Sequence, residues 1–223
     1  MEPIASSISK IYELEAKYGR PKNSVSLLTV SKKKRPEEIL KAASLGISHF
    51  GENYFQEAIK KIERLRELNL KWHFIGSIQS NKTREIAQTF DWIQSLDREK
   101  IAVKLNEYRG NTLSALNVCV QVNLSGEETK SGVPINQAQD LCELVEELPN
   151  LKLRGLMAIP SPQPDFQLQR IKFRELSRKF DDLKTNHPNI DILSMGMSND
   201  FEAAIAEGST MVRLGTALFG ARL

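Results

Sequence analysis

The sequence is poor in several features that mark particular classes of protein. Cysteine occurs only twice, at Cys119 and Cys142, without CxxC spacing and without histidines nearby. We therefore expect no disulfide framework and no zinc site, and the sparse cysteine favours a reducing cytoplasm. No apolar run approaches the roughly 20 residues that span a membrane. The first four residues lack a basic stretch followed by an apolar core, so we expect no secretory signal.

A strong charge of one sign is also missing. The formal net charge is only +3, and basic residues are mixed evenly with acidic ones, which argues against nucleic acid as a partner. Charged residues make up 26% and hydrophobic residues 40% of the 223 positions, as in a soluble globular protein. Because no linker, low-complexity stretch or domain boundary is visible, we expect a single domain over residues 1–223. We also expect a monomer that does not bind membranes.

The chain does contain a repeated alternation of strand-like and helix-like segments. A helix is predicted over residues 2–18, before the first apolar run. The eight predicted strands are residues 25–30, 49–51, 72–75, 92–94, 117–122, 151–157, 190–193 and 210–213. The alternation favours the α/β class and a single (β/α)8 TIM barrel with an extra N-terminal helix. The alternative is a doubly wound open sheet, which more often has five to seven strands.

Lys32 follows the first predicted strand, at the end where barrel enzymes and binding proteins place their sites. Side chains alternate along a strand, so Leu28, Val30 and Lys32 share one face. If that face lines the barrel, Lys32 enters a low-dielectric interior. Burial would then favour the neutral amine, which is the form that attacks an aldehyde. The alternative interpretation is a solvated Lys-Lys-Lys-Arg run over residues 32–35.

Two turns near the end of the chain combine glycine with hydroxyl side chains. Gly196 and Ser198 follow the seventh predicted strand, and Gly215 and Thr216 follow the eighth. In barrels these two loops often bind a phosphate through backbone N–H groups and a helix N-terminus. Either turn alone is a common helix cap. Two of them at the expected positions predict a phosphate site.

Arg213 lies two residues before the second of these turns and shares the inward face with Met211 if its strand lines the barrel. An arginine cannot shed its charge and must be paired. One interpretation is an ion pair with an acidic residue, and the other is a hydrogen bond to a pyridine nitrogen. A protonated arginine there keeps the ring nitrogen unprotonated, which weakens the ring as an electron sink.

A lysine amine, a phosphate site and a cation for a ring nitrogen are the groups that hold pyridoxal 5'-phosphate (PLP). A Schiff-base aldolase-type barrel that binds a sugar phosphate would need no cofactor and would lack its colour. Asn53 and His73 also lie at or just after strand ends. Asn53 forms a capping-box pattern with Gln56, so its role is either a helix cap or a site residue. His73 is either a hydrogen-bonded core residue or a ligand or base.

Eight short segments carry a resemblance to a known family. They read VSK at 30–32, HFGENY at 49–54, WHFIG at 72–76, QSNK at 79–82, KSG at 130–132, RGLMAI at 154–159, SMGMS at 194–198 and MVRLGT at 211–216. With these segments the chain resembles the pyridoxal phosphate homeostasis proteins, a family related to the barrel domain of alanine racemase. The resemblance covers nearly the full length. The combination is specific, although no single segment is.

The resemblance implies a single (β/α)8 barrel with one set of cofactor-binding residues: Lys32, Asn53, Ser198, Arg213, Gly215 and Thr216. It implies that PLP forms a Schiff base with Lys32, that Arg213 faces the pyridine nitrogen and that Asn53 lines the pocket near the ring. The other three residues would hold the phosphate. The family's first motif usually reads Val-Ser-Lys-x-Lys-Pro. Here one further residue precedes Pro36, so we expect a differently shaped loop.

The resemblance also implies a carrier rather than an enzyme. Racemase relatives draw a second base from a β-rich domain across a dimer, whereas this chain ends at Leu223, seven residues after Thr216. We therefore expect no such domain and no efficient racemisation. The expected protein buffers or delivers PLP and affects vitamin B6 and amino-acid balance, with PLP-acceptor enzymes or a regulatory protein as partners. The alternative is a PLP-dependent, racemase-like enzyme, which turnover of free amino acids would reveal.

Overall fold

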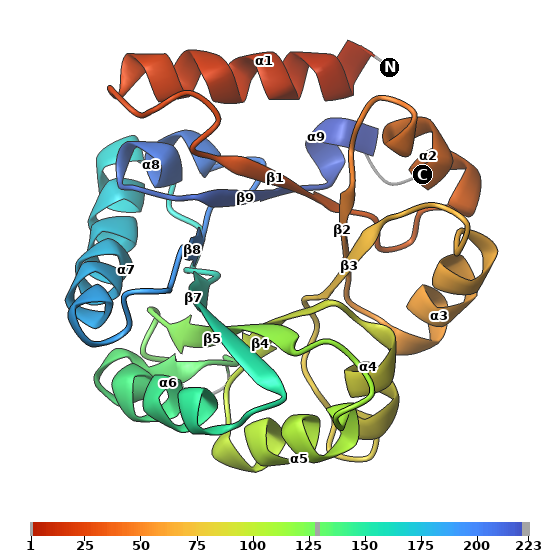
Figure 1. Cartoon of the computed structure of the whole chain (residues 1–223). Helices are drawn as coiled ribbons and strands as arrows, with labels where there is room; N and C mark the ends of the chain where they lie inside the picture. The colour runs from red at the N-terminus through yellow and green to blue at the C-terminus, as the bar shows by residue number, and fades with distance from the viewer. Residues whose placement is uncertain (1, 128–129, 220–223) are drawn as a thin grey trace.

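The chain folds into a closed ring of parallel strands with helices around it (Figure 1). The computed structural model describes residues 2–127 and 130–219. Eight strands form the ring: β1 (Ser26–Val30), β2 (His49–Glu52), β3 (Lys71–Phe74), β4 (Trp92–Leu96), β5 (Leu116–Asn123), β7 (Leu151–Ala158), β8 (Ile192–Ser194) and β9 (Met211–Leu214). The ring closes because β1 pairs with both β2 and β9, and β4 pairs with β5. This confirms the predicted barrel and excludes the open sheet.

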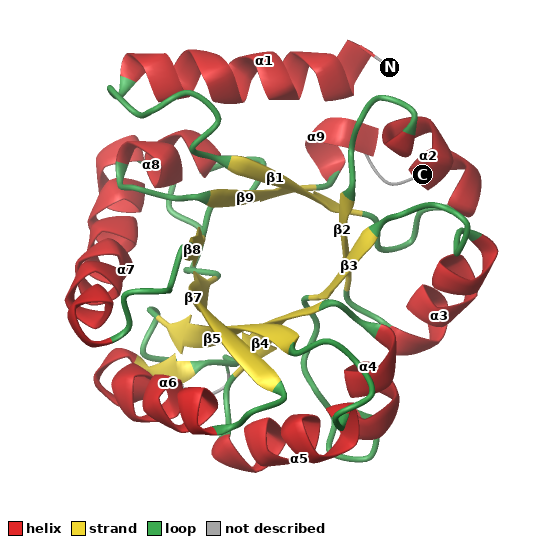
Figure 2. Cartoon of the chain, in the orientation of Figure 1, coloured by secondary structure: helices red, strands yellow, loops and turns green. Residues whose placement is uncertain are grey.

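Helices form the outer layer of the barrel (Figure 2). They are α1 (Glu2–Lys17), α2 (Pro36–Ala43), α3 (Phe55–Arg64), α4 (Thr83–Thr89), α5 (Glu99–Arg109), α6 (Ala138–Glu147), α7 (Phe166–Asn186), α8 (Phe201–Ala206) and α9 (Thr216–Phe219). Some begin with clear capping chemistry. At α2 the Arg35 N–H donates to Glu38 Oε2 at 2.8 Å, and Pro36 occupies the first turn. At α7 the Asp165 carboxylate accepts two backbone N–H groups.

The predicted N-terminal helix is confirmed as α1, which packs outside the ring against α8 and α9. Its apolar stripe, including Ile11 and Leu14, is buried in the outer core. Its one buried carboxylate, Glu15, accepts the backbone N–H of Asn23 at 3.0 Å and of Val25 at 2.8 Å. These two bonds tie the helix to the segment that leads into β1.

Two apolar layers hold the barrel together. The larger lies between the strands and the helices, and the smaller lies inside the ring. The inner cluster consists of Leu28, Trp92, Cys119, Met157, Ile192 and Met211, with Ile75 packed against it. Leu28 and Met211 therefore face the barrel interior, as predicted for the faces that carry Lys32 and Arg213. Cys119 is a small barrel-filling residue, also as predicted. Side chains of this size close the interior, so any ligand must bind at an end of the barrel.

The sequence-based bounds differ from the structure mainly around two connections. A short strand that was not predicted, β6 (Val133–Pro134), pairs with the end of β5 and leads into the 3-10 helix η1 (Ile135–Gln137). The helix predicted from Pro134 therefore begins as α6 four residues later. The seventh barrel strand is shifted and shorter than predicted, as β8. Among the described residues, no helix is long and apolar enough to cross a membrane.

Candidate cofactor site at the carboxyl ends of the strands

Four neighbouring strands bring the predicted site segments to the same end of the barrel. In the β1–β2 register Val30 lies opposite Gly51, and in the β1–β9 register Thr29 lies opposite Leu214. Between β8 and β9, the Arg213 N–H donates to the Gly196 carbonyl at 2.9 Å. The segments that carry Lys32, Asn53, Ser198 and the Gly215–Thr216 turn therefore follow adjacent strands. The structure thus places the sequence-predicted residues around one mouth of the barrel.

Lys32 follows β1 by two residues and is half-buried. Its segment leaves the strand through a turn in which the Lys34 N–H donates to the Ser31 carbonyl at 3.0 Å. Lys33 and Arg35 are exposed, which fits the solvated-run interpretation for those two residues only. Lys32 is buried to about the same degree as Leu27 and Val30 of β1, and it follows the carboxyl end of that strand.

Arg213 is the buried cation of the site, with 3% of its surface exposed. Its Nη1 donates to the Ser194 carbonyl at 2.8 Å and to Ser194 Oγ at 2.9 Å, and Nη2 donates to the Ala158 carbonyl at 2.8 Å. Burial lowers the pKa of Arg213 to about 10, with the charge of Asp200 opposing that effect. The guanidinium therefore stays protonated at neutral pH. In the described chain its hydrogen-bond partners are carbonyl and hydroxyl oxygens, so the predicted ion-pair alternative is wrong.

The turn after β8 needs glycine at residue 196. Gly196 has a φ of +96°, and a Cβ there would lie 2.6 Å from the Cβ of Ala204 and 3.0 Å from the Cα of Phe201. The turn is fixed further by the Met197 N–H, which donates to Asp200 Oδ1 at 2.6 Å. The turn therefore packs closely against the first turns of α8, where only glycine fits.

The turn after β9 packs directly on β1. A Cβ at Gly215 would lie 3.1 Å from the Val30 carbonyl oxygen, which is tighter than most real contacts. Thr216 is exposed and opens α9, and Ser198 is half-buried just before α8. Within residues 2–127 and 130–219, neither hydroxyl forms a hydrogen bond. Both hydroxyls are therefore available to an anion at this end of the barrel.

Asn53 carries an unsatisfied polar atom into the site. Its side-chain Oδ1 is buried and has no hydrogen-bond partner in the described structure. The helix-cap interpretation is wrong, because α3 begins at Phe55 with Tyr54 as its cap residue and without a side-chain cap bond. The Asn53 backbone instead packs against Gly76, where a Cβ would lie 2.1 Å from the Asn53 carbonyl oxygen. Buried amide oxygens are normally paired, so this one fits a ligand that donates a hydrogen bond.

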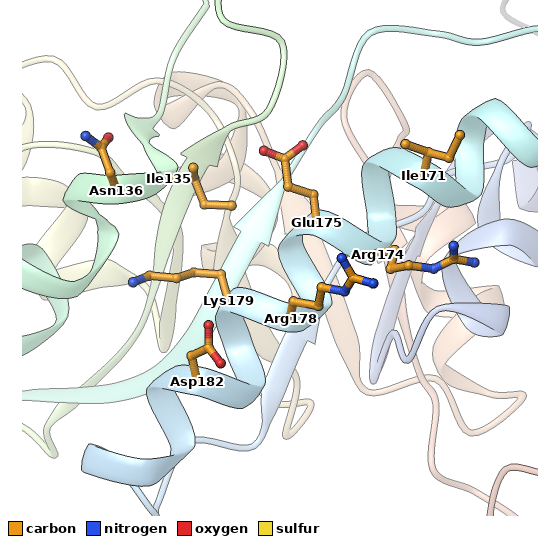
Figure 3. Close-up of a pocket in the computed structure, with 8 residues that line it drawn as sticks. All are labelled: Ile135, Asn136, Ile171, Arg174, Glu175, Arg178, Lys179 and Asp182. Atoms are coloured by element: carbon orange, nitrogen blue, oxygen red, sulfur yellow. The ribbon is translucent and has the colours of Figure 1, made fainter.

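A cavity of about 480 Å³ adjoins Asn53 between the starts of α3 and α4. Its lining includes Tyr54, Phe74, Gln79 and Lys82. A different groove, of about 590 Å³, lies on the outer face of the molecule (Figure 3). It is formed by η1 and α7 and contains side chains of both charge signs, none of which belongs to a strand end. Of the predicted site residues, Asn53 lines the first cavity, and none lines the outer groove.

His73 is a core residue and not part of the site. This confirms the interpretation of His73 as a hydrogen-bonded core residue rather than a ligand or base. Its ring stacks on Trp92 with the ring centroids 4.9 Å apart. Its Nε2 lies 2.8 Å from His49 Nδ1, and its Nδ1 lies 3.2 Å from Gln94 Nε2. Burial lowers the pKa of His73 well below its usual value, and positive charge on His49 and Arg154 adds to the effect. The imidazole is therefore neutral and fully engaged within the barrel.

Some of the site's supporting residues were not predicted from the sequence. Ser194 and the Ala158 carbonyl hold Arg213, although they come from β8 and β7. Ser31, which precedes Lys32, donates from Oγ to Glu52 Oε1 at 2.6 Å. These pairings join different strands, so no local pattern indicates them. Only the alternation of side chains on each strand could have suggested that Ser31 and Glu52 face the same layer.

The fold and this site define a (β/α)8-barrel protein with a lysine, a buried arginine and two glycine–hydroxyl turns at one mouth. The family described as "Alanine racemase, N-terminal domain" matches residues 21–223. The pyridoxal phosphate homeostasis protein of Vibrio cholerae is 50% identical over 218 residues, covering 96% of this chain and 92% of that protein. That of Escherichia coli is 48% identical over 222 residues, covering 98% and 95%.

A solved structure agrees with these relatives. PipY of Synechococcus elongatus, with PLP bound, has a TM-score of 0.82 and 34% identity, covering 94% of this chain and 100% of that chain. The chain therefore belongs to the alanine racemase N-terminal domain family and, within it, to the pyridoxal phosphate homeostasis proteins.

Proposed function

We propose that this chain binds PLP as a Schiff base on Lys32 and serves the balance of intracellular PLP and amino acids. The proposal rests on one main observation. The segments with Lys32, Arg213 and the two glycine turns lie together at one end of the barrel. The structure of PipY, which has a similar fold, has PLP bound. The buried, unpaired Oδ1 of Asn53 adds a polar atom that the described chain leaves for a ligand. The residues present therefore fit the cofactor.

Lys32 would supply the covalent link. The lysine amine would hold the aldehyde group of PLP, and forming that link would release water. The half-buried position of Lys32 after β1 supports this role, because it lies at the end of the barrel where the other site segments meet. Asn53, which follows the adjacent strand, would orient the bound ring through its unpaired oxygen.

The two turns would hold the phosphate. Gly196 and Gly215 let the backbone approach closely, and Ser198 and Thr216 add hydroxyl donors that have no other partner in the described residues. The start of α8 lies immediately after the first turn. Backbone N–H groups at such turns bind phosphate oxygens in many barrels. We assign Ser198, Gly215 and Thr216 to this role.

Arg213 would face the pyridine nitrogen and donate to it. Three hydrogen bonds to oxygens hold its guanidinium, and its pKa of about 10 keeps the cation protonated at neutral pH. A bound PLP normally supplies an electron sink, which needs positive charge on the ring nitrogen. A permanent donor at that position leaves the nitrogen unprotonated. This supports a carrier role without efficient catalytic turnover.

The remaining parts of the proposal concern the location of the protein in the cell, its oligomeric state and its partners. We place the protein in the reducing cytoplasm, since both cysteines are buried free thiols. We propose a single-domain monomer that passes PLP to acceptor enzymes or is controlled by a regulatory protein. The names of the relatives, pyridoxal phosphate homeostasis proteins, support this role. A racemase-like enzyme is the alternative.

The test is the absorbance spectrum of the purified protein before and after borohydride reduction, followed by peptide mapping. We expect a yellow band that reduction fixes onto Lys32 and that Lys32→Ala lacks. Lys33→Ala is the matched control, because Lys33 is the exposed neighbour in the same turn, and it should keep the band. A colourless protein that stays colourless with added PLP would exclude the cofactor. Steady turnover of free amino acids by the loaded protein would favour the enzyme.

A further inference from the structure

A buried polar cluster lies behind the segment that carries Lys32, on the outer side of the barrel wall. It consists of Ser31, Glu52, Glu57 and Lys61, and we call it the Lys61 cluster. Lys61 comes from α3, and its side chain is 5% exposed, while that of Glu52 is 0% exposed. Leu28, three residues before Ser31, lies on the opposite side of the wall in the inner cluster. The Lys61 cluster is therefore separate from the cofactor pocket.

Lys61 is the centre of this cluster. Its Nζ donates to the Ser31 carbonyl at 2.7 Å, to Glu52 Oε1 at 2.8 Å and to Glu57 Oε1 at 2.5 Å. Three donors of one ammonium group thus have three oxygen acceptors. The Ser31 hydroxyl donates to the same Glu52 oxygen at 2.6 Å. The bonds from Lys61 to the Ser31 carbonyl and to Glu52 join α3 to the segment after β1 and to β2. The bond to Glu57 lies within α3, and the Ser31–Glu52 bond joins the segment after β1 to β2.

The Lys61 cluster forms hydrogen bonds with the backbone on both sides of Lys32. Before it, the Ser31 carbonyl accepts from Lys61. After it, the Lys33 N–H donates to Glu57 Oε1 at 2.5 Å. Lys33 has a φ of +62°, a left-handed conformation that a lysine rarely adopts. The bond to Glu57 favours that conformation. Glu52 also directly precedes Asn53, so the same cluster joins two of the site segments.

Stability alone does not account for these charges. Burial raises the pKa of Glu52, and Lys61 opposes that effect. Replacing a buried ion pair with apolar side chains is often neutral or stabilising, so such a pair is weak evidence for a stabilising role. Glu52 Oε2 is buried without a hydrogen-bond partner among the described residues, so the network is not fully bonded. The bonds that it does form still fix the geometry of the segments that they join. The geometry fixed here is that of the turn around Lys32.

We propose that Lys61 is a positioning residue that acts with Glu52 and Glu57. These residues hold the turn at residues 31–33 so that the Lys32 amine lies at the mouth of the barrel beside Asn53. The proposal rests on the proposed function in one respect, since it takes Lys32 as the residue that bonds PLP. None of the three charged residues touches the cofactor. They act through the backbone on either side of Lys32.

Glu57 provides the sharpest test, because its side chain is 28% exposed and its removal threatens the fold least. Glu57→Ala deletes the acceptor for the Lys33 N–H, whereas Glu57→Gln keeps an oxygen in its place. In the protein without cofactor, we expect Glu57→Ala to speed hydrogen exchange of the Lys33 amide about tenfold. In the loaded protein, we expect it to weaken PLP binding about tenfold, since small misplacements of a reacting group are costly.

The controls separate positioning from general damage. Glu57→Gln should restore both quantities to within about twofold of the wild type. Lys61→Met should behave like Glu57→Ala. Lys60→Met, on the exposed side of the same helix, should change neither exchange nor binding. PLP binding is expressed per folded molecule, so a variant that merely unfolds more readily shows no loss.

The outcomes distinguish this inference from the function on which it rests. If the wild type loads Lys32 and Glu57→Ala loads it equally well, the positioning role is wrong and the proposed function stands. An unchanged rate of hydrogen exchange at the Lys33 amide in Glu57→Ala leads to the same conclusion. If the wild type itself yields no reduced adduct on Lys32, the proposed function fails and the positioning role fails with it. Faster exchange together with weaker binding, both rescued by Glu57→Gln, supports the inference.

Discussion

At the scale of single residues, Arg213 shows how this barrel can bury a cation whose hydrogen-bond partners, among the described residues, are carbonyl and hydroxyl oxygens. The guanidinium donates to oxygens of Ser194 and Ala158, which belong to the two strands that precede β9 around the ring. The planar fork of an arginine can reach both strands at once. Burial lowers its pKa, yet a value of about 10 leaves it charged under physiological conditions. Carbonyl and hydroxyl oxygens therefore hold the charged guanidinium in place.

This geometry makes Arg213→Lys a disruptive change despite the conserved charge. A lysine has one ammonium group and cannot span both sets of acceptors, so at least one buried carbonyl loses its partner. We expect a loss of about 1–3 kcal/mol in the free energy of unfolding, measured by urea denaturation, together with weaker PLP binding. Arg64→Lys is the control, since Arg64 is an exposed partner of Glu37 and should change stability by less than about 0.5 kcal/mol. Equal stability of Arg213→Lys and wild type would contradict this account.

Sequence alternation predicted the inward faces of the strands that lead to Lys32 and Arg213, and Leu28 and Met211 confirm those faces. The roles of Lys32 and Arg213 toward a cofactor stay predictions. The sequence pattern failed at Asn53. The Asn-x-x-Gln pattern matches a capping box, but the chain turns one residue later and α3 starts at Phe55. What decides the position of Asn53 is contact with Gly76, which follows the next strand. A contact across strands leaves no local pattern.

At the scale of elements, that contact couples the β2–α3 turn to the β3–α4 turn. The Asn53 carbonyl approaches Gly76 so closely that a Cβ would lie 2.1 Å from it, and the obstacle is backbone rather than a flexible side chain. The Ile75 N–H also donates to the Glu52 carbonyl at 2.9 Å, which extends the β2–β3 pairing to the turn. The position of Asn53 therefore depends on glycine in the neighbouring turn.

Gly76→Ala should separate the two turns. We expect about 1–3 kcal/mol of destabilisation from overpacking, and weaker PLP binding because Asn53 is displaced. Urea unfolding measures the first effect, and titration of the cofactor absorbance measures the second. Ser77→Ala introduces the same residue at the exposed position next to it and should be close to neutral. Normal PLP binding by Gly76→Ala would show that Asn53 does not need this contact.

Element types were predicted well because buried parallel strands are apolar runs, and the runs at 25–30 and 117–122 are close to β1 and β5. β6 was missed for a physical reason as well. It has two residues, Val133 and Pro134, and forms only by pairing with the end of β5. Tertiary contact, and not local preference, creates such a strand. The Lys61 cluster was missed on the same grounds, since its members come from β2, from α3 and from the segment after β1.

At the scale of the whole molecule, barrel formation brings together polar side chains from three neighbouring strands. His49, His73 and Gln94 come from β2, β3 and β4 and form a continuous chain of contacts at 2.8 Å and 3.2 Å. Burial lowers the pKa values of both histidines. For His49, the charge of Asp91 opposes this effect, while Lys71 and Arg154 add to it. The folded barrel therefore holds two neutral imidazoles.

Neutral buried histidines give stability a defined dependence on pH. The unfolded chain takes up a proton on each histidine near pH ~6.5, whereas the folded chain does so only at a lower pH. The stabilising contribution is therefore complete above pH ~6.5 and is lost as the pH falls below it. Glu52 and Asp200 act in the opposite direction, because burial raises their pKa values. A comparison between variants is therefore needed to isolate the histidines.

His73→Gln removes the central imidazole and leaves a side chain that can still form hydrogen bonds within the barrel. Between pH 7.5 and 5.5, we expect the wild type to lose about 1 kcal/mol more unfolding free energy than this variant. Urea unfolding at the two pH values measures the difference, and the carboxylate contributions cancel because both proteins share them. His187→Gln is a suitable control, since His187 lies 2.7 Å from Glu146 at the end of α7, outside the barrel interior. If wild type and His73→Gln showed an equal pH dependence, the folded barrel would hold a protonated His73 without loss of unfolding free energy, and this account would be wrong.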